Sequence, residues 1–289
     1  MRNTIQCGTR VLDRNPDLSY VMGVLNITPD SFSDAGRFYQ DHAPAFEIAF
    51  RQACEMVEQG AAILDVGGES TRPGAASVSL QEEQDRVLPM VERIGRELDV
   101  IVSVDTSRPE IMREAASLGA GMINDVRSLG MEGALQAAAE TGLSVCLMHM
   151  QGSPATMQLA PAYANVVSEV CDFLIQQTEH CIQAGIDRDK ILLDPGFGFG
   201  KSLQHNLYLL QQLQEVVALG YPVLAGLSRK SMLGGITGQP VEQRLAASVA
   251  AALLAAQAGA MIIRVHDVVE TVDALKVLRA VRDVKEDSV

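Results

Sequence analysis

Polar and ionisable residues follow short apolar runs at eight places in this chain, and they are the residue types that can bind ligands and move protons. The eight groups are Asn26 with 27–34, Asp65 with 67–74, Asp105 with 106–107, Asn124 with Asp125, 148–151, 194–201, 228–231 and Arg264 with 265–267. The rest of the chain is rich in Ala, Leu and Val, so packing alone does not explain a polar group after each run. We expect these groups to form one site.

Three short polar residues, Asp105, Asn124 and Asp194, form the first candidate set. Taken singly, each could cap the helix that follows it. Taken together, with Lys230 nearby, they favour recognition of a flat heterocycle with amide-like donors and acceptors. A carboxylate can accept two N–H bonds side by side, which suits the edge of a 2-aminopyrimidinone.

Apolar residues next to this set allow two interpretations. Met148 and Phe199 are either core residues or the walls of a slot for the heterocycle, and His149 is either a structural residue or part of the site. The stretch 196–202, GFGFGKS, invites comparison with a phosphate-binding loop, but Pro195 stands where that loop requires glycine. Its glycines instead favour close approach of the backbone to a planar ligand, with Phe199 closing over it.

Basic residues after the same runs form a second set: Arg72, Lys230, Arg264 and His266. Arg264 lies inside the apolar run 261–265, where a buried guanidinium needs an anion. A helix beginning near Asp267 would turn its positive N-terminus toward the same place. Asn26 could hold a hard cation such as Mg²⁺ that bridges the anion.

The apolar runs themselves predict eight strands, at 21–25, 61–66, 100–104, 121–124, 143–148, 190–194, 222–227 and 260–265. Continuous rather than alternating apolar runs are typical of parallel strands that are buried on both faces. Helical periodicity lies between them, as in Val87, Val91, Ile94 and Leu98. Thr106 or Ser107 could cap the helix that begins near Pro109.

Eight such units predict an α/β fold of the (β/α)₈ TIM-barrel type, whose usual length of about 250 residues nearly fills the 289 residues of the chain. The alternative is a doubly wound open sheet, but the first run lacks a GxGxxG motif and polar groups follow almost every run. Residues 1–19, with a turn at 15–17, are expected to form an N-terminal hairpin that closes one end of the barrel. We expect one domain, residues 1–289.

Composition excludes several partners. The net charge of −13, the aromatic content of 4% and the absence of Trp argue against nucleic-acid binding. Five scattered Cys without a CxxC pair or zinc spacing indicate reduced thiols. No signal-like apolar stretch begins the chain, and 246–263 is interpreted as a buried helix leading into a strand, so we expect a cytoplasmic protein without a membrane anchor.

Eight sequence blocks, in order along the chain, resemble the dihydropteroate synthase family of folate biosynthesis, the target of sulfonamides. The blocks are NITPDSFSDAG (26–36), LDVGGESTRPGA (64–75), SVDTSRP (103–109), INDVRS (123–128), LMHMQG (147–152), LLDPGFGFGK (192–201), GLSRKSMLG (226–234) and IIRVHDV (262–268). The resemblance implies a homodimeric barrel and a transferase. That enzyme would join 4-aminobenzoate to (7,8-dihydropterin-6-yl)methyl diphosphate with the help of Mg²⁺, releasing diphosphate and 7,8-dihydropteroate.

The resemblance also implies roles for individual residues. The pterin would be held by Asp105, Asn124, Met148, Asp194, Phe199 and Lys230. The diphosphate would be held by Asn26, Thr71, Arg72, Arg264 and His266, with Asn26 acting through Mg²⁺. The 4-aminobenzoate would be framed by Phe32, Thr71, Pro73, Lys230 and Ser231. The catalytic group would be Asp105, Asp194, Lys230 and Arg264.

These residues suit dissociative cleavage of the C–O bond followed by capture of the amine, since diphosphate is a good leaving group and no covalent nucleophile is needed. One alternative is a pterin-binding module of a methyltransferase system, which would not need Arg72, Arg264 or His266. Another is a barrel that has lost activity and serves as a structural or regulatory subunit, against which the complete motifs argue.

Overall fold

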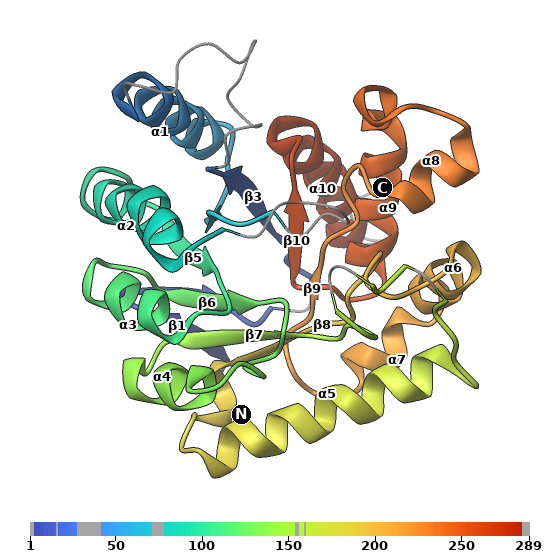
Figure 1. Ribbon diagram of the computed structural model, residues 1–289. Helices are drawn as coiled ribbons and strands as arrows, with labels where there is room; N and C mark the ends of the chain where they lie inside the picture. The colour runs from blue at the N-terminus through green and yellow to red at the C-terminus, as the bar shows by residue number, and fades with distance from the viewer. Residues whose placement is uncertain are drawn as a thin grey trace.

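Eight parallel strands close into a barrel with helices around its outside (Figure 1). The computed structural model describes residues 3–15, 17–27, 42–70, 78–153, 156–158 and 160–284. Hydrogen-bonded neighbours follow the order β8-β7-β6-β5-β4-β3-β10-β9, and the Leu193–Val223 bridge joins the two ends. The predicted (β/α)₈ barrel is confirmed, and the open-sheet alternative is wrong.

The strands are β1 (Thr4–Cys7), β2 (Arg10–Asp13), β3 (Tyr20–Asn26), β4 (Ile63–Gly67), β5 (Ile101–Asp105), β6 (Met122–Asp125), β7 (Ser144–Met148), β8 (Ile191–Asp194), β9 (Leu224–Ala225) and β10 (Ile262–Val265). The α-helices are α1 (His42–Glu58), α2 (Leu80–Glu97), α3 (Pro109–Ser117), α4 (Ala134–Thr141), α5 (Val166–Gln183), α6 (Leu203–Gln211), α7 (Leu213–Val217), α8 (Ser231–Thr237), α9 (Leu245–Gln257) and α10 (Val268–Asp283). Two short 3₁₀ turns cover Arg188–Lys190 and Val241–Gln243.

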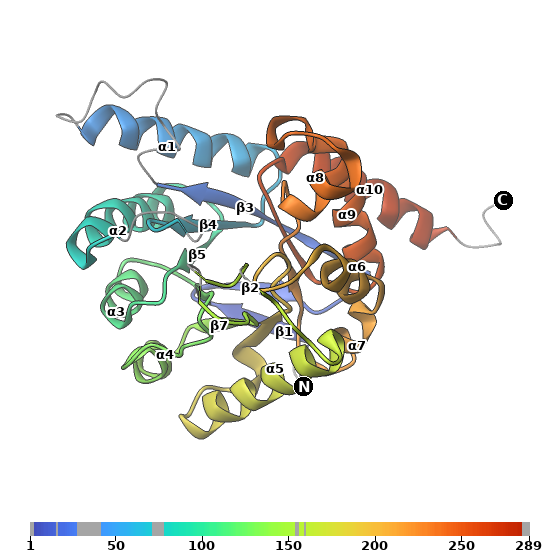
Figure 2. The ribbon, with the colours of Figure 1, turned by 45° about the vertical axis from the view of Figure 1, so that its right-hand side comes forward.

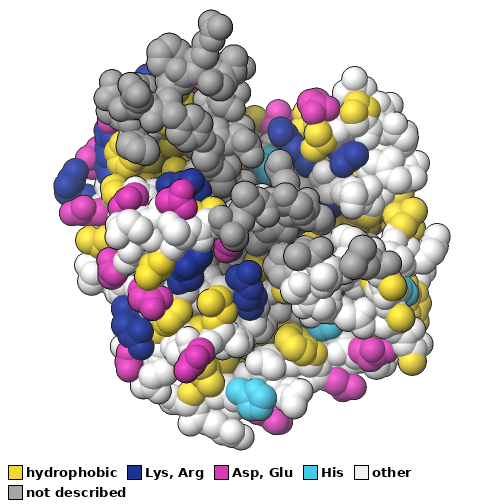
Figure 3. All heavy atoms as spheres, viewed as in Figure 1, with side chains coloured by type: hydrophobic (Ala, Val, Ile, Leu, Met, Phe, Trp, Pro, Cys, Tyr) yellow, Lys and Arg dark blue, Asp and Glu magenta, His cyan; other side chains and the backbone are white. Residues whose placement is uncertain are grey.

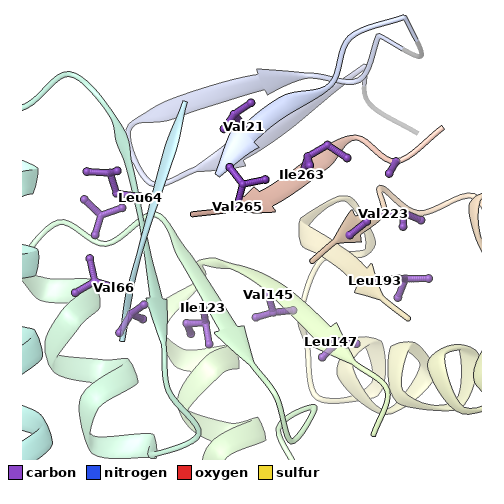
Figure 4. Close-up of a cluster of buried hydrophobic side chains, with 14 of the residues drawn as sticks. Val21, Leu64, Val66, Ile123, Val145, Leu147, Leu193, Val223, Ile263 and Val265 are labelled. Atoms are coloured by element: carbon purple, nitrogen blue, oxygen red, sulfur yellow. The ribbon is translucent and has the colours of Figure 1, made fainter. Parts of the chain in front are cut away.

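Alternate residues of each barrel strand face opposite sides, and this alternation separates the core from the site. The outward residues pack under the helices; those labelled in Figure 4 are Val21, Leu64, Val66, Ile123, Val145, Leu147, Leu193, Val223, Ile263 and Val265. The inward residues are apolar at the start of the strands and polar at their ends. Chemistry is therefore confined to the carboxyl-terminal mouth, as is usual for this fold.

The antiparallel hairpin of β1 and β2 closes the opposite end of the barrel, as the sequence predicts. Ile5, Cys7 and Leu12 from the hairpin are buried together with the first inward residues of the barrel strands, such as Met22 and Ile101. The Ser144 hydroxyl donates to the Gln6 carbonyl at 2.8 Å and so ties the hairpin to β7. These contacts make an apolar floor beneath the polar mouth.

Replacing Ile5 by alanine is expected to lower the free energy of unfolding by about 2–5 kcal/mol, because the side chain is 0% exposed and its removal leaves a cavity in the floor. Urea unfolding followed by circular dichroism would measure the change. Val11→Ala is the matched control, since Val11 lies in the same hairpin but is 50% exposed, and its effect should stay within about 0.5 kcal/mol. Equal losses for both variants would contradict the packed floor.

The N-terminal caps of two helices differ in whether the local sequence determines them. Ser79 caps α2 in a capping box with Glu82, within the local sequence. Pro109 begins α3 as predicted, but the cap position is Arg108, so the expectation that Thr106 or Ser107 caps this helix is wrong. Both hydroxyls are instead held by buried carboxylates: Thr106 donates to Glu83 at 2.7 Å, and Ser107 donates to Asp125.

The apolar stretch at 246–263 forms the Ala-rich helix α9 and leads into β10, as predicted, with α9 packed against α10 (Figure 2). Within the described ranges, no helix is long and apolar enough to cross a membrane. All five cysteines are free thiols, three of them buried. On the face seen in Figure 3, acidic and basic side chains are interspersed.

Candidate active site at the barrel mouth

The inward positions at the strand ends bring most of the predicted site residues together. Gly67, Asp105 and Asn124 are direct neighbours across β4, β5 and β6. Met148 pairs with Asp194 across β7 and β8. Asn26 ends β3, and Arg264 lies near the end of β10. The interpretation of Asp105, Asn124 and Asp194 as helix caps is wrong, because α3, α4 and α6 have Arg108, Gly133 and Ser202 at their cap positions.

An arginine held between two carboxylates forms the centre of this mouth. Arg264 Nε donates to Asp65 Oδ2 at 2.6 Å, and its Nη2 donates to Asp105 Oδ2 at 2.9 Å. The expectation that the Arg264 guanidinium needs an anion is therefore met from inside the chain. The two ion pairs hold the guanidinium in one orientation while its side chain remains partly exposed to the mouth.

Asp65 organises this centre, although the sequence prediction placed it in a polar group at the mouth without assigning it a role of its own. Its side chain is 0% exposed. Oδ1 accepts from the Ser103 hydroxyl at 2.6 Å, and Oδ2 accepts from the Asn124 amide at 3.0 Å as well as from Arg264. The signal for this role is an aspartate in the middle of an apolar strand, at the inward alternation, since a buried carboxylate requires partners.

The crowded charges shift the pKa values of the centre. Burial, together with the nearby Asp65 carboxylate, raises the pKa of Asp105, and Arg264 opposes part of that rise. Burial alone would lower the pKa of Arg264, but Asp65 and Asp105 outweigh burial and raise it. Arg264 therefore remains a cation at any physiological pH, and Asp105 is the carboxyl group of the pair that gains a proton more readily than usual.

A second half of the mouth contains Asp194, Lys230 and Phe199. Asp194 Oδ1 accepts from the Gly196 amide at 2.7 Å. Lys230 donates to the Phe197 carbonyl, and its Nζ lies 4.7 Å from the centre of the Phe199 ring. Burial raises the pKa of Asp194 and is partly opposed by the charge of Lys230. Burial lowers the pKa of Lys230 to about 8, with Asp194 opposing the change.

The apolar residues near the mouth differ in whether they line the proposed slot for the heterocycle or belong to the core. Phe199 is half-buried and lies beside Lys230, a position that fits the wall of a slot. Met148 is buried on the inward side of β7 next to Asp194. Phe197 is fully buried in the core under the helices, so only the second aromatic residue of the GFGF sequence lies at the mouth.

His266, Ser231 and the start of α10 lie on the remaining side. His266 Nδ1 is 3.0 Å from the Ser228 hydroxyl, and α10 begins at Val268, close to the predicted start. The Asp267 carboxylate does not cap this helix because Arg229 binds it. Ser231 is the first residue of α8 and is exposed.

Four of the predicted site residues lie outside the described residues: Phe32, Thr71, Arg72 and Pro73. The described part therefore contains all the residues expected to bind the pterin, three of those expected to bind the diphosphate (Asn26, Arg264 and His266), and Lys230 and Ser231 of those expected to bind 4-aminobenzoate.

The glycine-rich stretch does not form a phosphate-binding loop, in agreement with the sequence prediction. The ammonium group of Lys201 is buried and lies 2.9 Å from the Gly196 carbonyl oxygen and 2.9 Å from His149 Nδ1. His149 is also in ring contact with Tyr163 and Phe173. Burial and the charge of Lys201 lower the pKa of His149 to about 3, so its ring is neutral and structural. Burial lowers the pKa of Lys201 to about 7.

Comparison with known proteins agrees with this geometry. The family model described as pterin binding enzyme matches residues 22–266. A curated dihydropteroate synthase of Escherichia coli is 55% identical over 273 residues, which are 94% of this chain and 95% of that protein.

Solved structures of similar proteins share the fold. A Yersinia pestis dihydropteroate synthase in complex with a sulfonamide drug superposes with a TM-score of 0.90 at 49% identity, covering 97% of this chain and 100% of that one. A Xanthomonas albilineans dihydropteroate synthase with 4-aminobenzoic acid also gives a TM-score of 0.90 at 49% identity, covering 99% and 100% of the two chains.

Proposed function

The chain belongs to the dihydropteroate synthase family of pterin-binding enzymes, and from this premise we propose how its barrel mouth carries out the reaction. The enzyme is a transferase of folate biosynthesis. It condenses (7,8-dihydropterin-6-yl)methyl diphosphate with 4-aminobenzoate, giving 7,8-dihydropteroate and diphosphate. The proposal for the site rests above all on the polar set of Asp105, Asn124 and Asp194 at the ends of β5, β6 and β8, of which Asn124 and Asp194 are buried and Asp105 is half-buried.

We infer that this set binds the pterin. Asp194 offers a carboxylate oxygen toward the amino and ring N–H groups, and Asn124 offers an amide that can both donate and accept. Lys230 supplies a donor for the ring carbonyl, while Phe199 and Met148 cover the faces of the ring. Support comes from the depth of these side chains, since Asn124, Met148 and Asp194 are all buried at the mouth.

The diphosphate is assigned to the cationic side of the mouth, with Arg264, His266 and the start of α10 as its partners. When the C–O bond breaks, the electron pair stays on the diphosphate oxygen, whose growing negative charge the Arg264 guanidinium stabilises. The methylene carbon becomes a cation conjugated with the electron-rich dihydropterin. The Asp105 and Asp194 carboxylates favour that charge.

The neutral amino group of 4-aminobenzoate then donates its lone pair to the methylene carbon, forming the C–N bond and losing one proton to solvent. A strong base is not needed because the free arylamine is unprotonated near neutral pH. Ser231, exposed at the start of α8, and Lys230 are the described residues assigned to this substrate. Phe32, Thr71 and Pro73 complete the assignment as predictions from the sequence.

Mg²⁺ remains a proposal, and the donors at the mouth suit it. Asn26 presents an amide oxygen at the end of β3, on the inward alternation. Within the described residues, no cluster of three or more His, Cys, Asp or Glu could form a dedicated metal cage. Mg²⁺ commonly takes one or two protein ligands and completes its shell with water and substrate phosphates. When bound, it would neutralise diphosphate charge, with Asn26 as its protein ligand.

The direct test is formation of dihydropteroate and release of diphosphate by the purified protein, with both substrates, in the presence of Mg²⁺ and after its removal by a chelator. We expect both products with Mg²⁺ and little turnover without it. Omitting 4-aminobenzoate tests the order of bond changes, since dissociative cleavage predicts slow diphosphate release without the amine. Pterin binding with no turnover under any condition would instead favour the methyltransferase module.

The affinity for the dihydropterin substrate should fall above about pH 8. Lys230 retains its ammonium group below its lowered pKa of about 8 and loses it as the pH rises through that value. One pH unit above the pKa, only about a tenth of the sites are protonated, so the dissociation constant should rise about tenfold. Fluorescence titration from pH 7 to pH 9 measures it.

Lys230→Arg is the control for this pH dependence, because a guanidinium remains protonated over the whole range. The alkaline loss should disappear in that variant. If it persists, the titration belongs to another group, such as the buried Lys201, and the assignment to Lys230 is wrong.

We propose a homodimer that forms through the outer faces of α9 and α10. Val277 and Val281 lie one turn apart on α10 and are 65% and 68% exposed, and Leu254 on the adjacent α9 is 55% exposed. Exposed apolar side chains on neighbouring helices favour a protein interface. A second copy of the chain could bury them around a twofold axis.

Sedimentation equilibrium should give twice the chain mass of 31.0 kDa for the wild type and the single-chain mass for Val281→Lys. Ile182→Lys, which places the same charge at an exposed apolar position on α5, should leave the dimer intact. A monomeric wild type would contradict the proposal. A cytoplasmic location stays a prediction from the sequence.

A further inference from the structure

The turn at 196–202 between β8 and α6 has a side-chain donor on each of its seven successive carbonyl groups. Lys201 Nζ donates to Gly196 at 2.9 Å and to Phe199 at 3.1 Å. The other five carbonyls accept from Lys230, Gln158, Tyr163 and, for the last two, Asn206. A turn whose every carbonyl is bound, two of them by its own Lys201 and five by residues outside it, has little freedom to move.

Lys201 is the residue at the centre of this arrangement. It is 3% exposed, and its ammonium group also contacts His149 Nδ1 at 2.9 Å. An ammonium group has three N–H donors, and here all three have partners: one ring nitrogen and two carbonyl oxygens. Lys201 is thus an amino group buried inside the chain, and the carbonyl dipoles compensate the burial of its protonated form.

The turn fits closely on the strand end beside it, so its position depends on these bonds. Gly196 and Gly200 have φ angles of +68° and +59°. A Cβ at Gly196 would lie 1.9 Å from the His149 carbonyl oxygen, and one at Gly200 would lie 2.4 Å from the Gln151 carbonyl oxygen. Only glycine allows this approach of two backbones. Lys201 bridges the same two segments through His149.

The 196–202 turn also positions three parts of the proposed pterin site. Its first amide, at Gly196, donates to Asp194, and its Phe197 carbonyl accepts from Lys230. It also carries Phe199, whose ring centre lies 4.7 Å from the Lys230 ammonium. A shift of this turn would therefore move a carboxylate, a cation and an aromatic wall together.

We propose that Lys201 is a positioning residue for the pterin subsite, acting through Asp194, Lys230 and Phe199 without touching the substrate. This inference rests on the proposed function of the mouth. Lys201, whose sequence context resembles that of a phosphate-binding lysine, thus supports binding of the pterin rather than of the diphosphate. It does so from behind Phe199, the aromatic wall of the pterin subsite. His149, which contacts the Lys201 ammonium, and Asn206, which donates to the Lys201 carbonyl, help to hold the turn in place.

The test compares Lys201→Met with Lys190→Met. Lys190 also donates to a backbone carbonyl, that of Gly142, but it lies beside the start of β8, far from the mouth. We expect Lys201→Met to raise the dissociation constant for the dihydropterin diphosphate by about 10- to 100-fold, as misplacement of a binding wall does. The KM for 4-aminobenzoate should change less, because of the three residues that the turn places only Lys230 is also assigned to that substrate, and Lys190→Met should bind both substrates normally.

Two further measurements separate positioning from general destabilisation. Hydrogen exchange should speed up at the amides of 196–201 in Lys201→Met while the strand amides of β4 and β5 keep their protection. Lys201→Gln, which retains two donors, should recover part of the affinity and serves as the test variant if the methionine variant does not fold.

Unchanged pterin affinity in a folded Lys201→Met would overturn the inference, as would equal losses for both substrates with uniform loss of protection. Failure of the proposed function looks different: the wild type would then form no dihydropteroate. The titration of pterin binding to Lys201→Met would still decide whether Lys201 positions the binding wall.

Discussion

Replacing Arg264 by methionine is expected to lower both catalysis and stability. The variant leaves Asp65 and Asp105 facing one another without the cation that joins them, and Asp65 is fully buried. Removing one partner of a buried ion pair costs about 3–5 kcal/mol of unfolding free energy. Loss of the charge that stabilises departing diphosphate should lower kcat by about 10²–10³-fold. Urea unfolding and a diphosphate-release assay measure the two effects.

The double variant with Asp65→Asn separates these effects. Neutralising Asp65 removes the repulsion between the carboxylates, so stability should recover in part, while kcat should stay low because the guanidinium is still missing. Lysine at position 264 should not substitute fully, since an ammonium cannot present the planar fork that reaches both carboxylates. Wild-type stability of Arg264→Met would show that the two ion pairs are not coupled to the fold.

Asp194→Asn is expected to show the opposite relation between activity and stability. An amide oxygen can still accept from the Gly196 N–H, and burial already opposes ionisation of Asp194, as its raised pKa shows. The unfolding free energy should therefore stay within about 1 kcal/mol of wild type or rise, as happens where function has a stability cost. The kcat/KM for the pterin substrate should fall by about 10³-fold or more, because the site then presents an NH₂ group where the substrate needs an acceptor.

Asp125→Asn is the matched control for this prediction. Asp125 is a buried carboxylate one position from the site, and it accepts from the Arg127 and Leu129 amides at 2.8 and 2.7 Å as well as from Ser107. Its neutralisation should cost about 1–3 kcal/mol of stability. Activity of the folded fraction should be retained. The assignment of Asp194 fails if its asparagine variant binds pterin as tightly as the wild type does.

The sequence predicted the barrel and its mouth because both depend on local patterns. Each strand is a short apolar run, and the polar residue that ends it marks the mouth without any knowledge of its neighbours. Asp105, Asn124 and Asp194 could be found in this way. The cap of α3 could not, because the hydroxyls of Thr106 and Ser107 bind carboxylates from elsewhere in the fold.

The roles of Asp65 and Lys201, unlike their place in the polar groups, escaped prediction for the same physical reason. The main partner of Asp65 is Arg264, 199 positions away, and the ring contact of Lys201 comes from His149, 52 positions away. Nothing in the local spacing distinguishes a buried carboxylate that orients an arginine from one that caps a turn. Only the closed sheet decides which polar residues of distant strands become partners.

The closure of the barrel determines where the sheet can open locally. The two ends of the sheet meet at the Leu193–Val223 bridge, where the Leu193 amide donates to the Pro222 carbonyl at 2.9 Å and β9 is only two residues long. This seam is the joint with the fewest backbone bonds to break. It also separates the strand that carries Asp194 from the one that leads to Lys230. Local opening of the barrel is therefore easiest at this joint, and it would separate Asp194 from Lys230.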